Sequence, residues 1–260
     1  MGWAEEWTRS IKMTSRERLN SGSFWDHRAS SIGSNQFLNE MTEDQIRIVA
    51  PSSHHKVLEI GPGSGRLTVP LARSSSKVVS VDPSSRMLMS LAEKARAEGI
   101  GNLEMMNDYW ENIDTKTIGR FDKAVSSFSL FMLDVEKQLR RVSTVADEVF
   151  LFVPADIRIP FSVQEVMFGR IMVEHTDHVI LSNITEDMGL EPVSFVIEYP
   201  EAPCFDSLEA AVKNCFDLYG VPEDQEGPVA EHIKSAILKK GERYATSDSR
   251  GVGVIWWQNS

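Results

Sequence analysis

The segment at residues 57–67, which reads V-L-E-I-G-P-G-S-G-R-L, constrains the fold of this chain more than any other. Before its first glycine it is apolar or β-branched apart from Glu59, as a strand buried in a parallel sheet requires. Gly61, Gly63 and Gly65 let the backbone turn tightly and approach a ligand, because a Cβ there would occupy the ligand's volume. The segment therefore predicts a strand, a ligand-binding loop and a helix whose N-terminus points at the ligand.

Two classes of ligand bind such a loop, and Glu59 separates them. A dinucleotide places its pyrophosphate at the helix N-terminus, where the Glu59 carboxylate would repel it. S-adenosylmethionine carries an ammonium and a sulfonium and has no phosphate, so the same carboxylate attracts it. The dinucleotide fingerprint G-x-G-x-x-G would also require glycine at position 66, where the chain has Arg66. The loop favours S-adenosylmethionine over a nicotinamide cofactor, and a tight turn without any ligand is the structural alternative.

The pattern E-x-G-x-G-x-G resembles the first motif of the class I S-adenosylmethionine-dependent methyltransferases, and later segments resemble the family at matching spacing. The resemblance extends from about residue 22 to about residue 200. It implies that S-adenosylmethionine is the cofactor and that the binding residues are Arg28, Glu59, Gly61, Gly63, Gly65, Asp82, Met87, Asn107, Asp108, Ser126 and Phe128.

The resemblance also implies roles for several of these side chains. Asp82 ends the second strand, where a carboxylate accepts hydrogen bonds from both ribose hydroxyls, and Met87 lies near the adenine. The acid at Asn107-Asp108 receives the adenine amino group. Arg28, in the stretch F-W-D-H-R-A, would grip the cofactor's carboxylate, with a solvated helix start as the alternative.

Strand and helix patterns alternate from residue 57 to residue 153, which predicts a parallel, doubly wound sheet. The expected fold is α/β, with a seven-stranded Rossmann-like sheet that is mostly parallel and has an antiparallel edge strand. A helix is expected over 64–73, short or bent at Pro70, and another is expected to begin near Thr42. The expected organisation is an N-terminal helical segment over the cofactor site (1–50), a methyltransferase core (51–202 and 250–260) and a helical cap (203–249).

The cap is the main departure from a minimal fold of this family. About 50 residues lie between the last two expected strands, and their apolar residues recur at helical spacing. We expect the cap to lie over the C-terminal ends of the strands and to govern the choice of substrate, with Phe205, Phe216 and Tyr219 on its apolar face. The alternative is that these aromatic residues only pack the cap onto the sheet.

Charge and composition restrict the partners. The 260 residues carry a formal net charge of -11, which opposes binding to a phosphate backbone, so we expect a small-molecule substrate and no nucleic acid. No apolar run is long enough to span a membrane, and the N-terminus has no signal-peptide pattern. The two cysteines form neither a disulfide scaffold nor a zinc site, so the protein is expected in the cytoplasm. The N-terminal helix would serve as a lid or as the arm of a homodimer.

The sequence thus predicts a methyltransferase that transfers a methyl group in line to a small acceptor. No catalytic residue is assigned, because the sulfonium already activates the methyl group and a base is not obligatory. His175 and His178 are expected to be surface residues, so no metal is assigned. Ser126-Ser127-Phe128-Ser129 stands where relatives that modify amide or adenine nitrogens have N/D-P-P-Y. The alternatives are a non-catalytic S-adenosylmethionine-binding protein or partner-dependent subunit and, third, a nicotinamide-dependent oxidoreductase.

Overall fold

A computed structural model describes residues 2–14, 16–28, 36–157, 159–200, 204–246 and 250–259. Its α-helices are α1 (Trp3–Met13), α2 (Gly22–Arg28), α3 (Gln36–Val49), α4 (Thr68–Ser74), α5 (Ser85–Ala97), α6 (Val135–Ser143), α7 (Phe161–Phe168), α8 (Asp177–Asp187), α9 (Leu208–Tyr219) and α10 (Glu226–Ala236). Short 3₁₀ helices are η1 (Arg16–Asn20), η2 (Trp110–Asn112) and η3 (Glu223–Gln225). The strands are β1 (Lys56–Ile60), β2 (Lys77–Val81), β3 (Leu103–Met106), β4 (Phe121–Ser127), β5 (Ala146–Pro154), β6 (Val193–Tyr199), β7 (Cys204–Phe205), β8 (Leu238–Lys240), β9 (Arg243–Ala245) and β10 (Arg250–Gln258).

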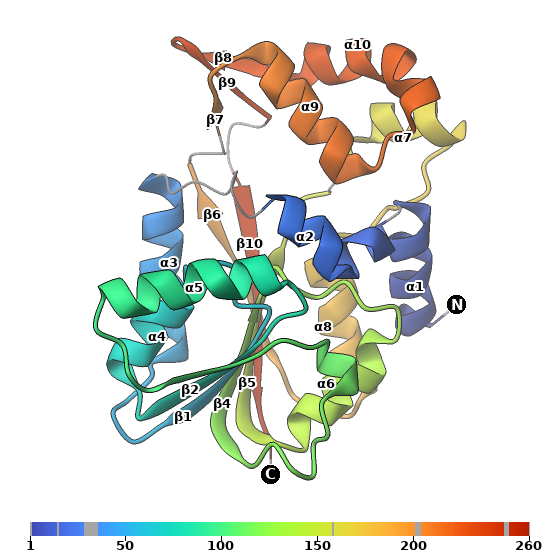
Figure 1. Ribbon diagram of the computed structural model, residues 1–260. Helices are drawn as coiled ribbons and strands as arrows, with labels where there is room; N and C mark the ends of the chain where they lie inside the picture. Colours follow the sequence, from blue (N-terminus) through green and yellow to red (C-terminus); the bar gives the residue numbers. More distant parts are fainter. Residues whose placement is uncertain are drawn as a thin grey trace.

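The main sheet has seven strands in the order β3-β2-β1-β4-β5-β10-β6. The strands β1 to β5 pair in parallel, whereas β10 runs antiparallel to both β5 and β6. In Figure 1, α3, α4 and α5 lie on one side of this sheet and α1, α6 and α8 lie on the other. The doubly wound, mostly parallel sheet with an antiparallel pair at one edge is thus confirmed.

Both faces of the central strands are buried, as the sequence of β1 requires. Val57 belongs to the apolar cluster that contains Leu71 of α4, whereas Leu58 belongs to the opposite cluster with Leu139 of α6 and Ile180 of α8. Helices therefore cover the two faces, and a ligand can reach the strands only at their ends.

The first helix after the glycine loop is shorter than its expected range, 64–73. It begins at Thr68, because the preceding residues form the turn. Pro70 is the third residue of α4, a position whose N–H has no partner within a helix, so the proline costs no hydrogen bond. The expected short helix is confirmed, with a later start.

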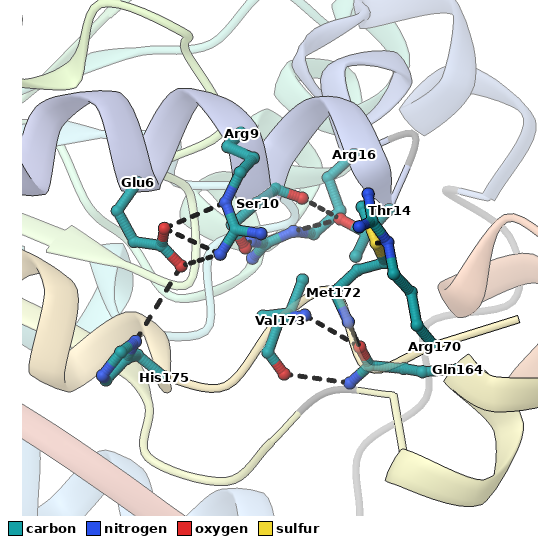
Figure 2. A network of polar contacts seen from close by, with 10 residues as sticks. All are labelled: Glu6, Arg9, Ser10, Thr14, Arg16, Gln164, Arg170, Met172, Val173 and His175. Atoms are coloured by element: carbon teal, nitrogen blue, oxygen red, sulfur yellow. Dashed lines mark hydrogen bonds and ion pairs between the residues drawn. The ribbon is translucent and has the colours of Figure 1, made fainter. Parts of the chain in front are cut away.

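The N-terminal segment is tied to the core by a buried arginine. Arg16 in η1 is 2% exposed, and its Nη1 donates to both carboxylate oxygens of Asp177 at 2.7 and 2.8 Å. Its Nη2 donates to Ser10 Oγ at 2.6 Å and its Nε to Thr14 Oγ1 at 2.8 Å (Figure 2). This network fixes η1, whose last two residues reach the site described below.

The cap, defined here as residues 204–246 together with α7, is not purely helical. Between β6 and β10 the chain forms α9 and α10, as expected, and also a three-stranded sheet in the order β7-β9-β8, which the sequence analysis did not predict. An apolar cluster joins Val163 of α7 to Val212 and Val229 of the insertion. Phe216 and Tyr219 pack against this cluster, so two of the three aromatic residues assigned to the cap contribute to its own core.

Candidate functional site

A cavity of about 240 Å³ opens at the C-terminal ends of β1, β2 and β4. Its walls come from the glycine loop, the ends of β2 and β4, the start of α5 and the segment that contains η1 and α2. The lining residues are Leu19, Asn20, Trp25, Glu59, Gly61, Pro62, Gly63, Ser64, Arg66, Leu67, Asp82, Pro83, Met87, Ser127, Phe128, Ser129 and Phe131.

The three glycine positions of the loop differ in what an added Cβ would contact. All adopt positive φ (71°, 54° and 89° for Gly61, Gly63 and Gly65). A Cβ on Gly61 would lie 2.2 Å from Ser129 Cβ, and one on Gly65 would lie 2.5 Å from Leu91 Cδ1. A Cβ on Gly63 would meet no heavy atom within 4 Å. Gly61 and Gly65 are therefore required by packing, whereas Gly63 keeps space open at the cavity wall.

Asp82 connects the second strand to the glycine loop. Its carboxylate accepts hydrogen bonds from the backbone N–H of Ser84 at 2.8 Å and of Gly63 at 3.1 Å. Burial raises the pKa of Asp82, and these two hydrogen bonds oppose the rise. Each carboxylate oxygen has a further lone pair, so Asp82 can still accept a ribose hydroxyl while it holds the loop.

Glu59 is a second buried acid of the cavity lining. Its side chain is 2% exposed and accepts a hydrogen bond from Ser80 Oγ at 3.2 Å. Burial raises its pKa to about 7, while its contacts with Thr68 and Ser80 and the charge of Arg66 lower it. A cationic group bound beside Glu59 would restore the ionised form.

Aromatic and apolar side chains form the outer wall. Trp25 of α2 and Phe131 lie with ring centroids 6.2 Å apart, and Trp25 Nε1 donates to the carbonyl of Leu19 at 2.6 Å. Phe128 has a φ of 57°, a strained value for a side chain of its size that costs about 1–3 kcal/mol. Strain of this kind concentrates at functional sites, and here it turns the Phe128 backbone at the cavity wall.

Six of the eleven residues assigned to the cofactor line the cavity: Glu59, Gly61, Gly63, Asp82, Met87 and Phe128. Ser126 is 2% exposed and hydrogen-bonds Ser129 Oγ at 2.8 Å behind the wall. The side chain of Arg28 lies outside the described residues. Gly65 serves packing, as shown above.

Asn107 and Asp108 do not line the cavity. Asn107 donates to the carbonyl of Asp82 at 3.0 Å, and Asp108 accepts from Tyr109 N–H and Asn112 Nδ2 at 2.7 Å each. Their assignment to the adenine stays a prediction.

Lining residues that were not predicted include Leu19, Asn20 and Ser127, which are distant in sequence from the glycine loop, and Arg66, which lies in the loop itself. Arg66 was used only to argue against a dinucleotide, although it lines the cavity directly behind the third glycine. Its position directly after the third glycine is the sequence signal that could have predicted Arg66 as a lining residue. No cap residue belongs to the described part of the lining. The cap instead contacts η1, whose Leu19 and Asn20 line the cavity, because Arg18 donates to the carbonyl of Asp217 in α9.

Metal and membrane features are absent from the parts of the chain that the structure describes. No cluster of three His, Cys, Asp or Glu side chains there could hold a metal ion. His178 hydrogen-bonds Ser194 Oγ at 2.8 Å, while His175 lies edge-on to Trp3. None of the described helices has both the length and the apolar character needed to cross a bilayer.

Replacing Asp82 by alanine should weaken binding of S-adenosylhomocysteine by about 1.5–3 kcal/mol, the worth of hydrogen bonds to a charged group. The ribose hydroxyls lose their acceptor and the Gly63 N–H loses the bond that holds the loop. Calorimetric titration measures the change. Asp82→Asn keeps one acceptor oxygen, so its affinity should lie between those of the unsubstituted protein and Asp82→Ala. A loss below about twofold (~0.4 kcal/mol) in Asp82→Ala would show that another residue holds the ribose.

The fold and the loop define a class of protein: the chain has the class I, Rossmann-like S-adenosylmethionine-dependent methyltransferase fold. Residues 57–148 match the family model described as a methyltransferase domain. The YcgJ protein from Bacillus subtilis has a TM-score of 0.60 at 14% identity over 85% of this chain and 99% of that one. The N-methyltransferase NodS from Bradyrhizobium japonicum, solved with S-adenosyl-L-homocysteine, has a TM-score of 0.57 at 11% identity over 92% and 98%.

A curated relative is similar in sequence over a smaller part. Ribosomal RNA small subunit methyltransferase A of Desulforapulum autotrophicum is 35% identical over 97 residues, which are 34% of this chain and 34% of that protein. The chain thus spans about a third of the length of this relative. Because the relative is named for ribosomal RNA, the expected absence of a nucleic-acid partner is not confirmed, and it rests on net charge alone.

Proposed function

We propose that the protein is an S-adenosylmethionine-dependent methyltransferase that acts on a small-molecule acceptor. The observation that carries the proposal is the cavity itself, whose lining combines an open glycine, Gly63, with two buried acids, Glu59 and Asp82. This arrangement suits a ligand with hydroxyls at one end and an ammonium at the other, and it disfavours a pyrophosphate.

The cofactor, when bound, supplies a methyl group already activated by a sulfonium. The residues of this chain then have three tasks: Asp82 holds the ribose, Glu59 faces the ammonium, and the apolar wall of Trp25, Phe128 and Phe131 excludes water. Orientation and exclusion of water are sufficient for an in-line displacement when the acceptor has a free lone pair. No residue is therefore assigned as a base.

The size and charge of the protein favour a small acceptor. The net charge of -11 disfavours a polyanion, and the cavity is bounded by η1 and α2, not by an open basic groove. We propose that residues 1–50 cover the cofactor site and that the cap affects substrate choice through the contact of Arg18 with Asp217. Methylation of RNA is the second candidate, favoured by the similarity to the ribosomal RNA enzyme.

A labelling experiment tests these readings together. The protein is incubated with S-adenosylmethionine labelled at its methyl group and with either the low-molecular-mass fraction of a cell extract or total RNA. We expect label in small molecules and none in RNA. If the RNA fraction carries label that ribonuclease releases, the acceptor is RNA and not a small molecule. Binding of cofactor without transfer to any fraction would favour the non-catalytic reading, and stabilisation by NADH alone would overturn the cofactor assignment.

The affinity for S-adenosylhomocysteine should depend on pH through Glu59. Since the pKa of Glu59 is about 7 in the free protein, an ammonium that needs the ionised carboxylate should bind less tightly as pH falls below 7, by up to about tenfold per unit. Above pH 7 the affinity should level off. Calorimetric titrations across this range measure the effect, and Glu59→Gln should remove the dependence.

The same variant gives a check on the unliganded protein. A carboxyl whose pKa is raised on folding binds its proton more tightly when folded, so its contribution to stability is lost as pH rises through about 7. At about pH 8, Glu59→Gln should therefore raise the free energy of unfolding by about 1–3 kcal/mol. An unchanged pH profile of affinity in Glu59→Gln would show that another group titrates.

A further inference from the structure

Arg66 is a cation at the cavity wall whose hydrogen bonds all go to neutral oxygens. It follows Gly65 and is half-buried. Its Nη1 donates to Thr42 Oγ1, and its Nη2 donates to Gln45 Oε1 and Ser127 Oγ, each at 2.8 Å. These contacts fix the plane of the guanidinium against α3 and β4, and they use three of its five N–H donors.

The charge of Arg66 is not neutralised by a hydrogen-bonded acid within the described part of the chain. Burial lowers its pKa to about 10, opposed by the charge of Glu59, so the side chain remains protonated at neutral pH. The charged residues of the described lining are Glu59, Asp82 and Arg66, which makes Arg66 its sole cation. A partly buried cation without an ion-pair partner loses part of its hydration, and an anionic ligand would offset that cost.

A second observation at the same place points to a missing acceptor. Gln45 is completely buried, and its Oε1 accepts from both Arg66 and Ser127, which fixes the orientation of the amide. Its Nε2 has no hydrogen-bond partner. Unsatisfied buried donors are rare, so the surroundings of Arg66 carry more donors than acceptors. Gln45 itself is not part of the described lining, so the group that a ligand in the cavity can reach is Arg66, and a pure acceptor such as a carboxylate would reduce the excess of donors there.

We propose that Arg66 binds the α-carboxylate of S-adenosylmethionine, an inference that rests on the proposed function. The cofactor's amino-acid end carries an ammonium and a carboxylate, and the cavity offers Glu59 and Arg66 as groups of opposite charge for them. The contacts with Thr42, Gln45 and Ser127 hold the guanidinium in place and leave its Nε–H and one Nη1–H free. These two donors point to different sides, so Arg66 can give the carboxylate one charge-assisted hydrogen bond in addition to its charge. This places the carboxylate on the glycine loop, not on Arg28 as the family resemblance implies.

The test compares two ligands that differ by one group. S-adenosylhomocysteine and its decarboxylated analogue, 5′-(3-aminopropyl)thio-5′-deoxyadenosine, are titrated calorimetrically into the full chain and its variants. We expect the full chain to prefer S-adenosylhomocysteine by at least about tenfold and Arg66→Gln to lose that preference, as the loss of a charge-assisted pair predicts. Arg66→Lys, which keeps the charge but not the planar fork, should retain part of it.

Arg73→Gln is the matched control, because Arg73 is an exposed arginine of α4 that pairs with Glu98 and does not belong to the described lining. It should leave both affinities unchanged. If the full chain binds both ligands equally, or if Arg66→Gln weakens both by the same factor, the inference is wrong and Arg66 only supports the loop. If Arg66→Gln does not fold, Arg66→Lys decides by the same comparison. A full chain that binds neither ligand would refute the proposed function and this inference with it, whereas binding without preference refutes the inference alone.

Discussion

Replacing Gly63 by valine is expected to abolish binding of S-adenosylhomocysteine while leaving a folded protein. A Cβ on Gly63 meets no heavy atom within 4 Å, so the new side chain would enter open space at the cavity wall and not the core. The φ of 54° adds strain of about 1–2 kcal/mol, less than the stability of an ordinary domain. We expect a loss of at least about a hundredfold (~2.7 kcal/mol) in calorimetric titration.

The glycines of this chain provide matched controls for that result. Gly99 also has positive φ (67°) and open space at its Cβ, but it lies outside the cavity lining, so Gly99→Val carries the same strain and should not affect binding. Gly65→Val should instead lower the melting temperature, because its Cβ would overlap Leu91. Unchanged affinity in a folded Gly63→Val protein would remove the loop from the site.

Replacing Arg16 by alanine should destabilise the protein by about 3–5 kcal/mol, the usual cost when one partner of a buried ion pair is removed. Asp177, whose side chain is 5% exposed, would remain as an uncompensated charge, and the hydroxyls of Ser10 and Thr14 would lose their donor. Denaturant unfolding followed by circular dichroism measures the change. Because η1 also carries Leu19 and Asn20 to the cavity, cofactor affinity should fall as well.

Two controls separate the cost of leaving a buried charge unpaired from the cost of losing a charge. Arg140→Ala breaks the exposed pair with Glu136 on α6 and should change stability by about 0–1 kcal/mol. Arg16→Met combined with Asp177→Leu removes both buried charges and should recover much of the loss. If Arg16→Ala is no more destabilising than Arg140→Ala, the pair does not hold the N-terminal segment in place.

Individual elements show why some predictions succeeded and others failed. The second strand, expected to lead to Asp82, ends at Val81, since a central parallel strand is an apolar run that local sequence defines. The helix expected from Thr42 begins at Gln36, and Thr42 lies within it. Thr42 has the sequence pattern of an N-cap, but its hydroxyl instead accepts a hydrogen bond from Arg66. An N-cap is predicted from the local sequence, but the same side chain can instead hydrogen-bond a residue that is distant in sequence.

The cap was only half predicted for a related reason. Its helices have apolar residues at a period visible in sequence, whereas β7, β8 and β9 have two or three residues each and depend on pairing with one another. The joining of α7 to the cap depends on contacts between Val163 and residues of α9 and α10, which α8 and β6 separate from α7 in the sequence. Such contacts leave no period in the sequence.

The loop and its chemistry could be predicted from the sequence alone, because an acid and three glycines lie within seven residues, 59–65, at the end of a strand, and the second acid directly follows the adjacent strand. Which of these glycines borders open space was visible only in the folded structure. That division depends on Ser129 and Leu91, which pack against Gly61 and Gly65 from other parts of the chain. The same holds for Arg66, whose surroundings are built by α3 and β4. Local backbone requirements are encoded locally, whereas the environment of a side chain is set by whatever the fold packs against it.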